Sequence, residues 1–123
     1  MMTIQELYKR IGGDYDQAIS VLRLDKLIDK HIKKFEDSGV VEGLLSAADN
    51  MNPTELFEAS HAVKGVCANL GLTKLSAVAS DITEEFRPGN IRKMSDDEVK
   101  ARIEEIRVIY DQIVEGIRTY KDI

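Results

Sequence analysis

The chain has 123 residues, with 22 acidic and 17 basic side chains and a net charge of −5 near neutral pH. This length fits one domain with one core, so we expect residues 1–123 to form a single domain. Basic residues never run longer than two, which argues against nucleic acid or an anionic membrane as the main partner. Since apolar stretches are too short to span a bilayer and the start does not resemble a secretory signal, we expect an independent cytoplasmic monomer.

Short helices are predicted at the beginning of the chain. Apolar positions over 3–11 recur at helical spacing, and the glycine pair at 12–13 ends that pattern. Asp14 then suits the capping position of a second short helix. We therefore expect one or two short helices before the main bundle.

A longer amphipathic segment begins at residue 24. Ser38 and Gly39 predict a bend or an interruption, after which the helical pattern continues to about residue 48. Over 24–35, one face is apolar and faces a core, and its members are Leu24, Leu27, Ile28, Ile32 and Phe35. His31 falls inside this apolar sector, so we expect it to be partly buried or at the boundary of the core, and not catalytic.

The sequence NPTE at 52–55 predicts the start of the next helix at Pro53, because proline suits the first helical position and asparagine is a good cap. This helix should end near Leu70, where Gly71 can adopt the left-handed conformation. A further helix is predicted over 73–86, followed by a loop at RPGN, 87–90.

The last helix starts at the capping box SDDE, 95–98. Its apolar residues alternate spacings of four and three, and they are Val99, Ile103, Ile106, Tyr110, Ile113, Ile117 and Tyr120. Such a seam packs along a helical bundle. With no strand-like alternation, we expect an all-α fold, a four-helix bundle with short helices at its beginning. An intermolecular coiled coil through the same seam is the alternative.

The helix beginning at Pro53 has two unlike faces. Leu56, Val63 and Leu70 define a core face, whereas His61 lies about 160° from Val63 and should point to solvent. The neighbours of His61 on the outer face, one turn to either side, are Phe57, Glu58, Lys64, Gly65 and Ala68. Glycine and alanine leave the helix surface beside His61 accessible, because they have little or no side chain. A mid-helix glycine nevertheless costs roughly 1 kcal/mol relative to alanine. The cluster therefore predicts close approach of another molecule.

The chemistry expected of this cluster is phosphoryl transfer. An imidazole is largely neutral and nucleophilic near neutral pH, so a ring nitrogen of His61 could accept a phosphoryl group. Lys64, one turn further along, could stabilise the charge on that group, and Gly65 would leave room for an incoming active site. An ordinary surface that carries a histidine beside a lysine is the alternative reading of these residues.

Metal and redox chemistry are not predicted. The two histidines lack a metal-binding spacing, and the single cysteine, Cys67, has no nearby second ligand. We interpret Cys67 as a small apolar core residue and expect the chain to bind no cofactor or metal.

The stretch HAVKGVCANLG resembles the signature of histidine-containing phosphotransfer domains, with His61, Lys64, Gly65 and Gly71 at the matching positions. The resemblance is strongest over about 40–115. It implies an up-and-down helical bundle in a multistep phosphorelay, in which His61 takes a phosphoryl group from a receiver-domain aspartate or a kinase and passes it to a receiver aspartate. Lys64 would stabilise charge, and Gly65 would provide access.

The resemblance also implies partners and further positions. Response-regulator receiver domains and a sensor histidine kinase would be the partners, with magnesium held by the receiver. Thr83 and Arg87 occupy positions where family members often place polar groups near the transfer site. We expect the partner to contact both of them, together with Phe57, Glu58 and Ala68. No glycine-rich phosphate loop is present, so we expect no autokinase activity. A helical docking module that is never phosphorylated is the alternative function.

Overall fold

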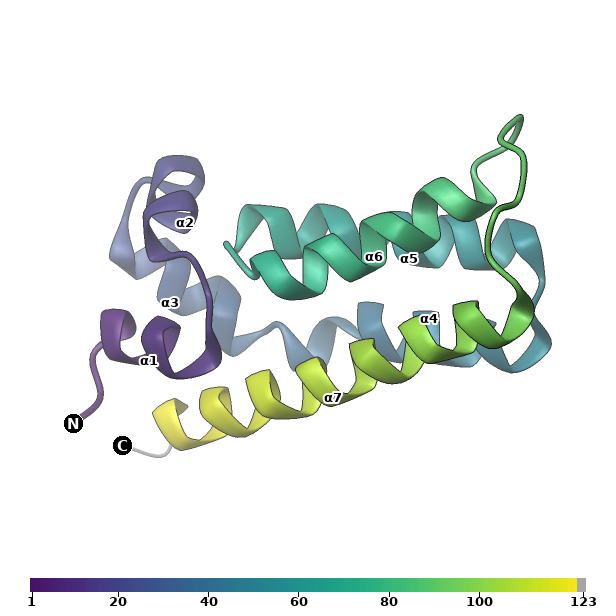
Figure 1. Ribbon diagram of the computed structural model, residues 1–123. Coiled ribbons are helices and arrows are strands. Elements are labelled where there is room, and N and C mark those ends of the chain that lie inside the picture. Colours follow the sequence, from purple (N-terminus) through teal and green to yellow (C-terminus); the bar gives the residue numbers. More distant parts are fainter. Residues whose placement is uncertain (122–123) are drawn as a thin grey trace.

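A computed structural model of the chain describes residues 1–121, and all the regular structure in this part is helical (Figure 1). The predicted all-α class is confirmed. Within the described residues, no helix is both long and apolar enough to cross a membrane. The expected end of the domain at residue 123 lies outside the described part.

Four longer helices alternate in direction along a common axis (Figure 1). They are α4 (Val40–Asn50), α5 (Pro53–Asn69), α6 (Thr73–Phe86) and α7 (Asp96–Lys121). Three short helices gather at one end of this bundle, and they are α1 (Ile4–Ile11), α2 (Tyr15–Leu22) and α3 (Asp25–Lys33). The architecture is therefore the expected up-and-down bundle, with short helices at the start of the chain.

The number of short helices is three, because the predicted interruption after residue 35 is a complete break. A single 3₁₀ turn, Glu36–Ser38, follows α3, and Gly39 then adopts φ 73°, the left-handed region that glycine enters without strain. The chain restarts as α4 at Val40. The segment predicted as one bent helix is thus two helices.

Local capping explains where the long helices begin and end. The Asn52 side-chain oxygen accepts from the amide of Glu55 at 3.0 Å, directly before Pro53. At the start of α7, Ser95 and Glu98 exchange two bonds of 3.1 Å, the predicted capping box. Between α5 and α6, Gly71 has φ 67°. The start of α5 and both ends of α6 agree with the prediction, and α5 ends one residue early.

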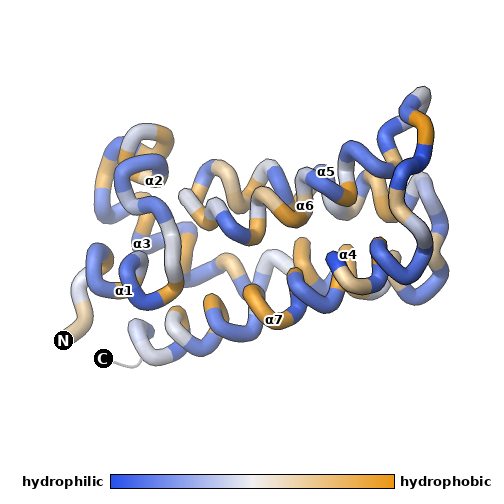
Figure 2. Tube along the Cα trace, viewed as in Figure 1, coloured by the Kyte–Doolittle hydropathy of each residue, from blue (hydrophilic) through white to orange (hydrophobic). Residues whose placement is uncertain are grey.

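The core lies between the long helices, and α5 and α6 form its most extensive pair. Apolar positions recur along α7 at the spacing of helical turns (Figure 2). Six of the seven residues of the predicted seam are buried by the rest of the chain: Val99, Ile103, Ile106, Tyr110, Ile113 and Ile117. The seventh, Tyr120, lies near the end of α7 and is half-buried. Because this stripe is occupied within one chain, the alternative of an intermolecular coiled coil through it is wrong.

The expectation for Leu24 is wrong, and His31 takes the boundary position, one of the two that were expected for it. Leu24 is 58% exposed, because it precedes the helix as its capping residue and does not join the buried stripe of Ile28, Ile32 and Phe35. His31 is exposed as well. It stands at the edge of that stripe, on the rim of an open groove that Leu22, Phe35 and Val66 also line.

The short helices hold the end of α5 that follows the motif. The Tyr8 hydroxyl of α1 donates to the carbonyl of Leu70 at 2.7 Å, and the Gln17 side chain of α2 donates to the carbonyl of Ala68 at 2.9 Å. Both bonds satisfy carbonyls that the helix end leaves without an intrahelical donor. They fix the position of α5 from outside the four-helix core.

Candidate functional site

The inner face of α5 is fully packed, which determines where its outer face points. Leu56, Ser60, Val63 and Cys67 are all inaccessible to solvent. His61 is exposed, as the helical periodicity predicts. The histidine therefore stands on the outside of the bundle, near the middle of a helix anchored from below.

An aromatic ring supports the imidazole. The rings of Phe57 and His61 lie one turn apart with centroids 5.9 Å apart and planes inclined by 12°, a stacked pair. Phe57 is itself half-buried against the core. Stacking on a partly anchored ring restricts the orientation of His61 while leaving it open to solvent.

Arg87, beyond the end of α6, completes this stack. Its guanidinium carbon lies 5.4 Å from the centroid of the Phe57 ring, within cation–π range. Its Nε and Nη2 atoms each donate to one carboxylate oxygen of Glu84 at 2.9 Å. The structure thus brings the predicted residues Phe57, His61 and Arg87 together and adds Glu84, which the sequence analysis missed. Its spacing of three residues before an arginine was the available signal.

Lys64 lies on the Glu84 side of the site. The hydrogen bonds from Arg87 lower the pKa of the Glu84 carboxyl, and the charge of Lys64 contributes in the same direction. Lys64 is half-buried, and its carbonyl accepts from the Ser76 hydroxyl at 3.3 Å. Two cations therefore interact with one carboxylate near Phe57, the ring on which the exposed histidine stacks.

Gly65 faces open space. No atom outside its own local helix lies within 4 Å of the position that a Cβ would occupy, so packing between helices does not require glycine here. Ala68, one turn further along, is half-buried. The helix surface on this side of His61 therefore carries the small residues Gly65 and Ala68, as predicted.

Glu58 occupies the opposite flank of the outer face. It is exposed and lines a shallow groove between α4 and α5, together with Gly43 and Ala59. It is therefore separated from the side of the face on which Phe57 and Arg87 meet. The exposed position agrees with a role in partner contact but does not join Glu58 to the charged cluster.

A direct contact of Thr83 with a partner is ruled out, because its side chain is fully buried. Thr83 Oγ1 lies 3.0 Å from Ser60 Oγ and 2.9 Å from the carbonyl oxygen of Ala79, so its single hydroxyl hydrogen can be donated to either acceptor. Ser60 donates in turn to the carbonyl of Phe57 at 3.1 Å. Thr83 therefore joins α6 to α5 directly beneath His61, and Ser60 is a second supporting residue that the sequence analysis did not single out.

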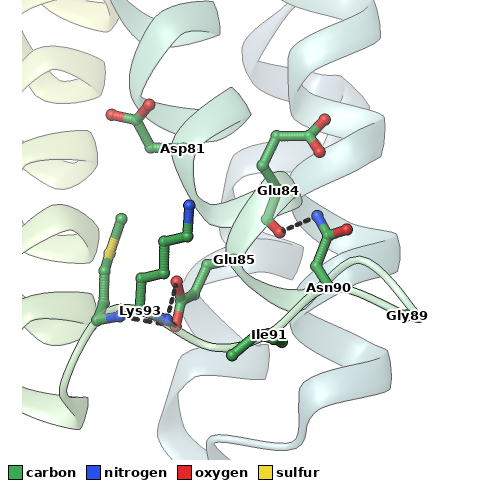
Figure 3. A pocket seen from close by; sticks show the side chains of 8 residues that line it. Asp81, Glu84, Glu85, Gly89, Asn90, Ile91 and Lys93 are labelled. Atoms are coloured by element: carbon green, nitrogen blue, oxygen red, sulfur yellow. Dashed lines mark hydrogen bonds between the residues drawn. The ribbon is translucent and has the colours of Figure 1, made fainter.

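A cleft lies beside the site, and hydrogen bonds between residues that line it hold the end of α6 in place (Figure 3). The buried carboxylate of Glu85 accepts from Nε of Arg92 at 3.0 Å and from the amide nitrogens of Lys93 and Met94. Asn90 donates to the carbonyl of Glu84 at 2.9 Å, as Figure 3 also shows. These bonds hold the loop after α6 against the helix that carries Glu84.

The metal-ligating side chains and the one thiol of the described residues are placed as follows. No group of three or more histidine, cysteine or acidic side chains within residues 1–121 is placed to hold a metal ion. Cys67 is buried, and burial raises the pKa of its thiol to about 12. The thiol thus stays protonated and acts as an apolar core group.

The comparisons with known proteins agree with this geometry. A family model for the Hpt domain matches residues 26–116, a span that includes α4, α5 and α6 in full. The searches of curated proteins and of solved structures return no significant match. Because the family model covers well over half of the 123 residues, the chain belongs to the Hpt domain family.

Proposed function

We propose that this chain is a histidine phosphotransfer protein of a multistep phosphorelay, with His61 as the residue that carries the phosphoryl group. Membership of the Hpt family supports a phosphotransfer role in two-component signalling. The observation that carries the assignment to His61 is its exposed imidazole, stacked on Phe57 and flanked by Lys64. Receiver domains and a sensor histidine kinase in the cytoplasm are the proposed partners.

The transfer step requires only a nucleophile from this chain. The ring nitrogen of His61 that bears no proton attacks the phosphorus of an aspartyl phosphate, and its lone pair forms the nitrogen–phosphorus bond. The phosphorus–oxygen bond breaks, and its electron pair stays on the partner's carboxylate. The proton on the other ring nitrogen exchanges with water, and donation to the next receiver is the reverse of this step.

The surrounding residues assist without forming bonds to phosphorus. Lys64 offers an ammonium group to the phosphoryl oxygens as charge develops on them. Gly65 leaves space for the edge of the receiver's active site. Magnesium belongs to the receiver's acidic pocket in this proposal, and the chain supplies no autokinase activity.

The second histidine provides a matched control for the test. His31 is also exposed and also lies on a helix, but the cluster around His61 is absent there. Incubation with a phosphorylated receiver domain should give the wild-type chain and the His31→Gln variant the same acid-labile phosphoryl label. The His61→Gln variant should remain unlabelled.

Label that persists in the His61→Gln variant would refute the assignment. If neither protein is labelled by any receiver, while both bind receivers with equal affinity, the chain is a docking module instead. Calorimetry of receiver binding, run beside the labelling assay, separates these results.

A further inference from the structure

Glu84 occupies a position that the phosphotransfer reaction does not require but that affects both neighbouring cations. Its two oxygens take up Nε and Nη2 of Arg87 in a two-bond pair, each bond 2.9 Å long. The same carboxylate lies near enough to Lys64 for the two charges to interact. About half of the Glu84 side chain is exposed, so this pair is accessible to solvent and to ligands.

A phosphoryl group on His61 would seek the same donors. It carries up to about two negative charges, and guanidinium groups bind phosphate through the same pairs of N–H donors that bind carboxylates. In the structure, the Nε–Nη2 edge of Arg87 is already used by Glu84, while the guanidinium rests against Phe57, the ring on which His61 stacks. Phosphohistidine and Glu84 would therefore compete for this Nε–Nη2 pair of donors. The Glu84 charge would also offset part of the positive charge that Arg87 and Lys64 offer to the phosphoryl group.

We propose that Glu84 is a positioning residue that holds Arg87 away from the phosphoryl group and thereby favours donation from His61 over retention. This inference rests on the proposed function of His61. In the unphosphorylated state Glu84 keeps its ion pair with Arg87. When Arg87 binds the phosphoryl group instead, that ion pair is lost, so the unphosphorylated state is favoured. The chain would thus pass its phosphoryl group on more completely than a chain with a neutral residue at this position.

The test is the equilibrium constant for phosphoryl exchange between a receiver domain and the chain, read from the acid-labile label at equilibrium. Glu84→Gln keeps the size of the side chain and removes its charge. Since one exposed ion pair changes such an equilibrium by a factor of about two to five, we expect about threefold more phosphohistidine in this variant. The effect should shrink at high salt, as interactions between exposed charges do.

A double-mutant cycle and a matched ion pair make the interpretation specific. In an Arg87→Gln background, the effect of Glu84→Gln should be clearly smaller than in the wild-type chain, and what remains reports the charge interaction with Lys64. Glu104 pairs with Arg107 at the same spacing of three residues on α7, so Glu104→Gln is the control and should leave the constant unchanged.

Each departure from this pattern is informative. An unchanged constant in Glu84→Gln, an equal rise in the Arg87→Gln background, or an equal rise in Glu104→Gln would overturn the role of Glu84 while leaving His61 as the acceptor. A wild-type chain that takes no label on His61 would overturn the proposed function itself, and the role of Glu84 with it.

Discussion

Gly65 offers a prediction in which stability and transfer change in opposite directions. Glycine inside a helix is less favourable than alanine by about 1 kcal/mol, mainly because glycine loses more backbone entropy on folding. At Gly65 nothing within 4 Å would meet a new Cβ, and φ lies outside the left-handed region. The full propensity gain should therefore appear, and Gly65→Ala should stabilise the chain by about 1 kcal/mol.

Thermal unfolding followed by circular dichroism measures this gain. For a domain of this size, about 1 kcal/mol corresponds to a rise of about 3–6 °C in the midpoint. Gly43 on α4 is the matched control, because it is also helical, exposed and free of neighbours within 4 Å. Gly43→Ala should give the same rise in midpoint.

Phosphotransfer should separate the two positions. The Gly65→Gln variant, which adds a long uncharged side chain with good helix propensity, should receive phosphoryl from a receiver at least about tenfold more slowly, since misplacement by an ångström costs that much or more. Gly43→Ala should transfer at the wild-type rate. A loss of stability in Gly65→Ala would contradict the conclusion that a Cβ at this position meets no other atom. A wild-type transfer rate in Gly65→Gln would contradict the proposal that Gly65 gives the receiver access to His61.

Three further predictions concern the scaffold. Gly71→Ala should destabilise the chain by at least about 2 kcal/mol in urea titrations, because φ is 67° and the new Cβ would lie 2.2 Å from the carbonyl oxygen of Asp14; a neutral substitution would contradict this. Burial alone raises the pKa of the Glu85 carboxyl, but bonds from Arg92 and two backbone amides outweigh it and lower the pKa. The ionised carboxylate therefore stabilises the fold fully above its unfolded pKa of about 4.3, and this is lost as pH falls through the lower folded value. Glu85→Gln should then cost about 2 kcal/mol at pH 7 and progressively less below pH 4, and a pH-independent difference would count against it. Burial raises the pKa of Cys67 to about 12, so iodoacetamide at pH 8 should modify it only in denaturant; rapid labelling of the folded chain would disprove the burial.

The helix ends and the orientation of α5 could be predicted from the sequence because each depends on local chemistry. Asn52 and Pro53 define a start, Gly71 defines an end, and a spacing of 3.6 residues per turn then assigns every side chain of α5 to a face. His61 is exposed for this reason alone. Periodicity also located the buried seam of α7.

The remaining features depend on how helices pack, which periodicity does not encode. Thr83 is polar but faces Ser60 across the α5–α6 contact, so its burial follows from the register of two helices. The position of Arg87 over Phe57 depends on the same register. His31 lies at the boundary and is not partly buried, because an apolar sector on a helical projection is wider than the stripe that neighbouring helices cover.

The two faces of α5 have different roles: the inner face packs against the core and the outer face is open to solvent. Adjacent residues in the sequence belong to different faces. Ser60 is fully buried and bonded to Thr83, whereas His61, the next residue, is exposed. A helix held to its neighbour by a buried hydroxyl pair needs no stabilising contact from its outer face. The outer face of α5 can therefore keep Gly65, a glycine that lowers helix stability, because Gly65 takes no part in the attachment of α5 to the core. If the proposed function is right, a visiting active site would meet a histidine that is stacked on Phe57 and open to solvent.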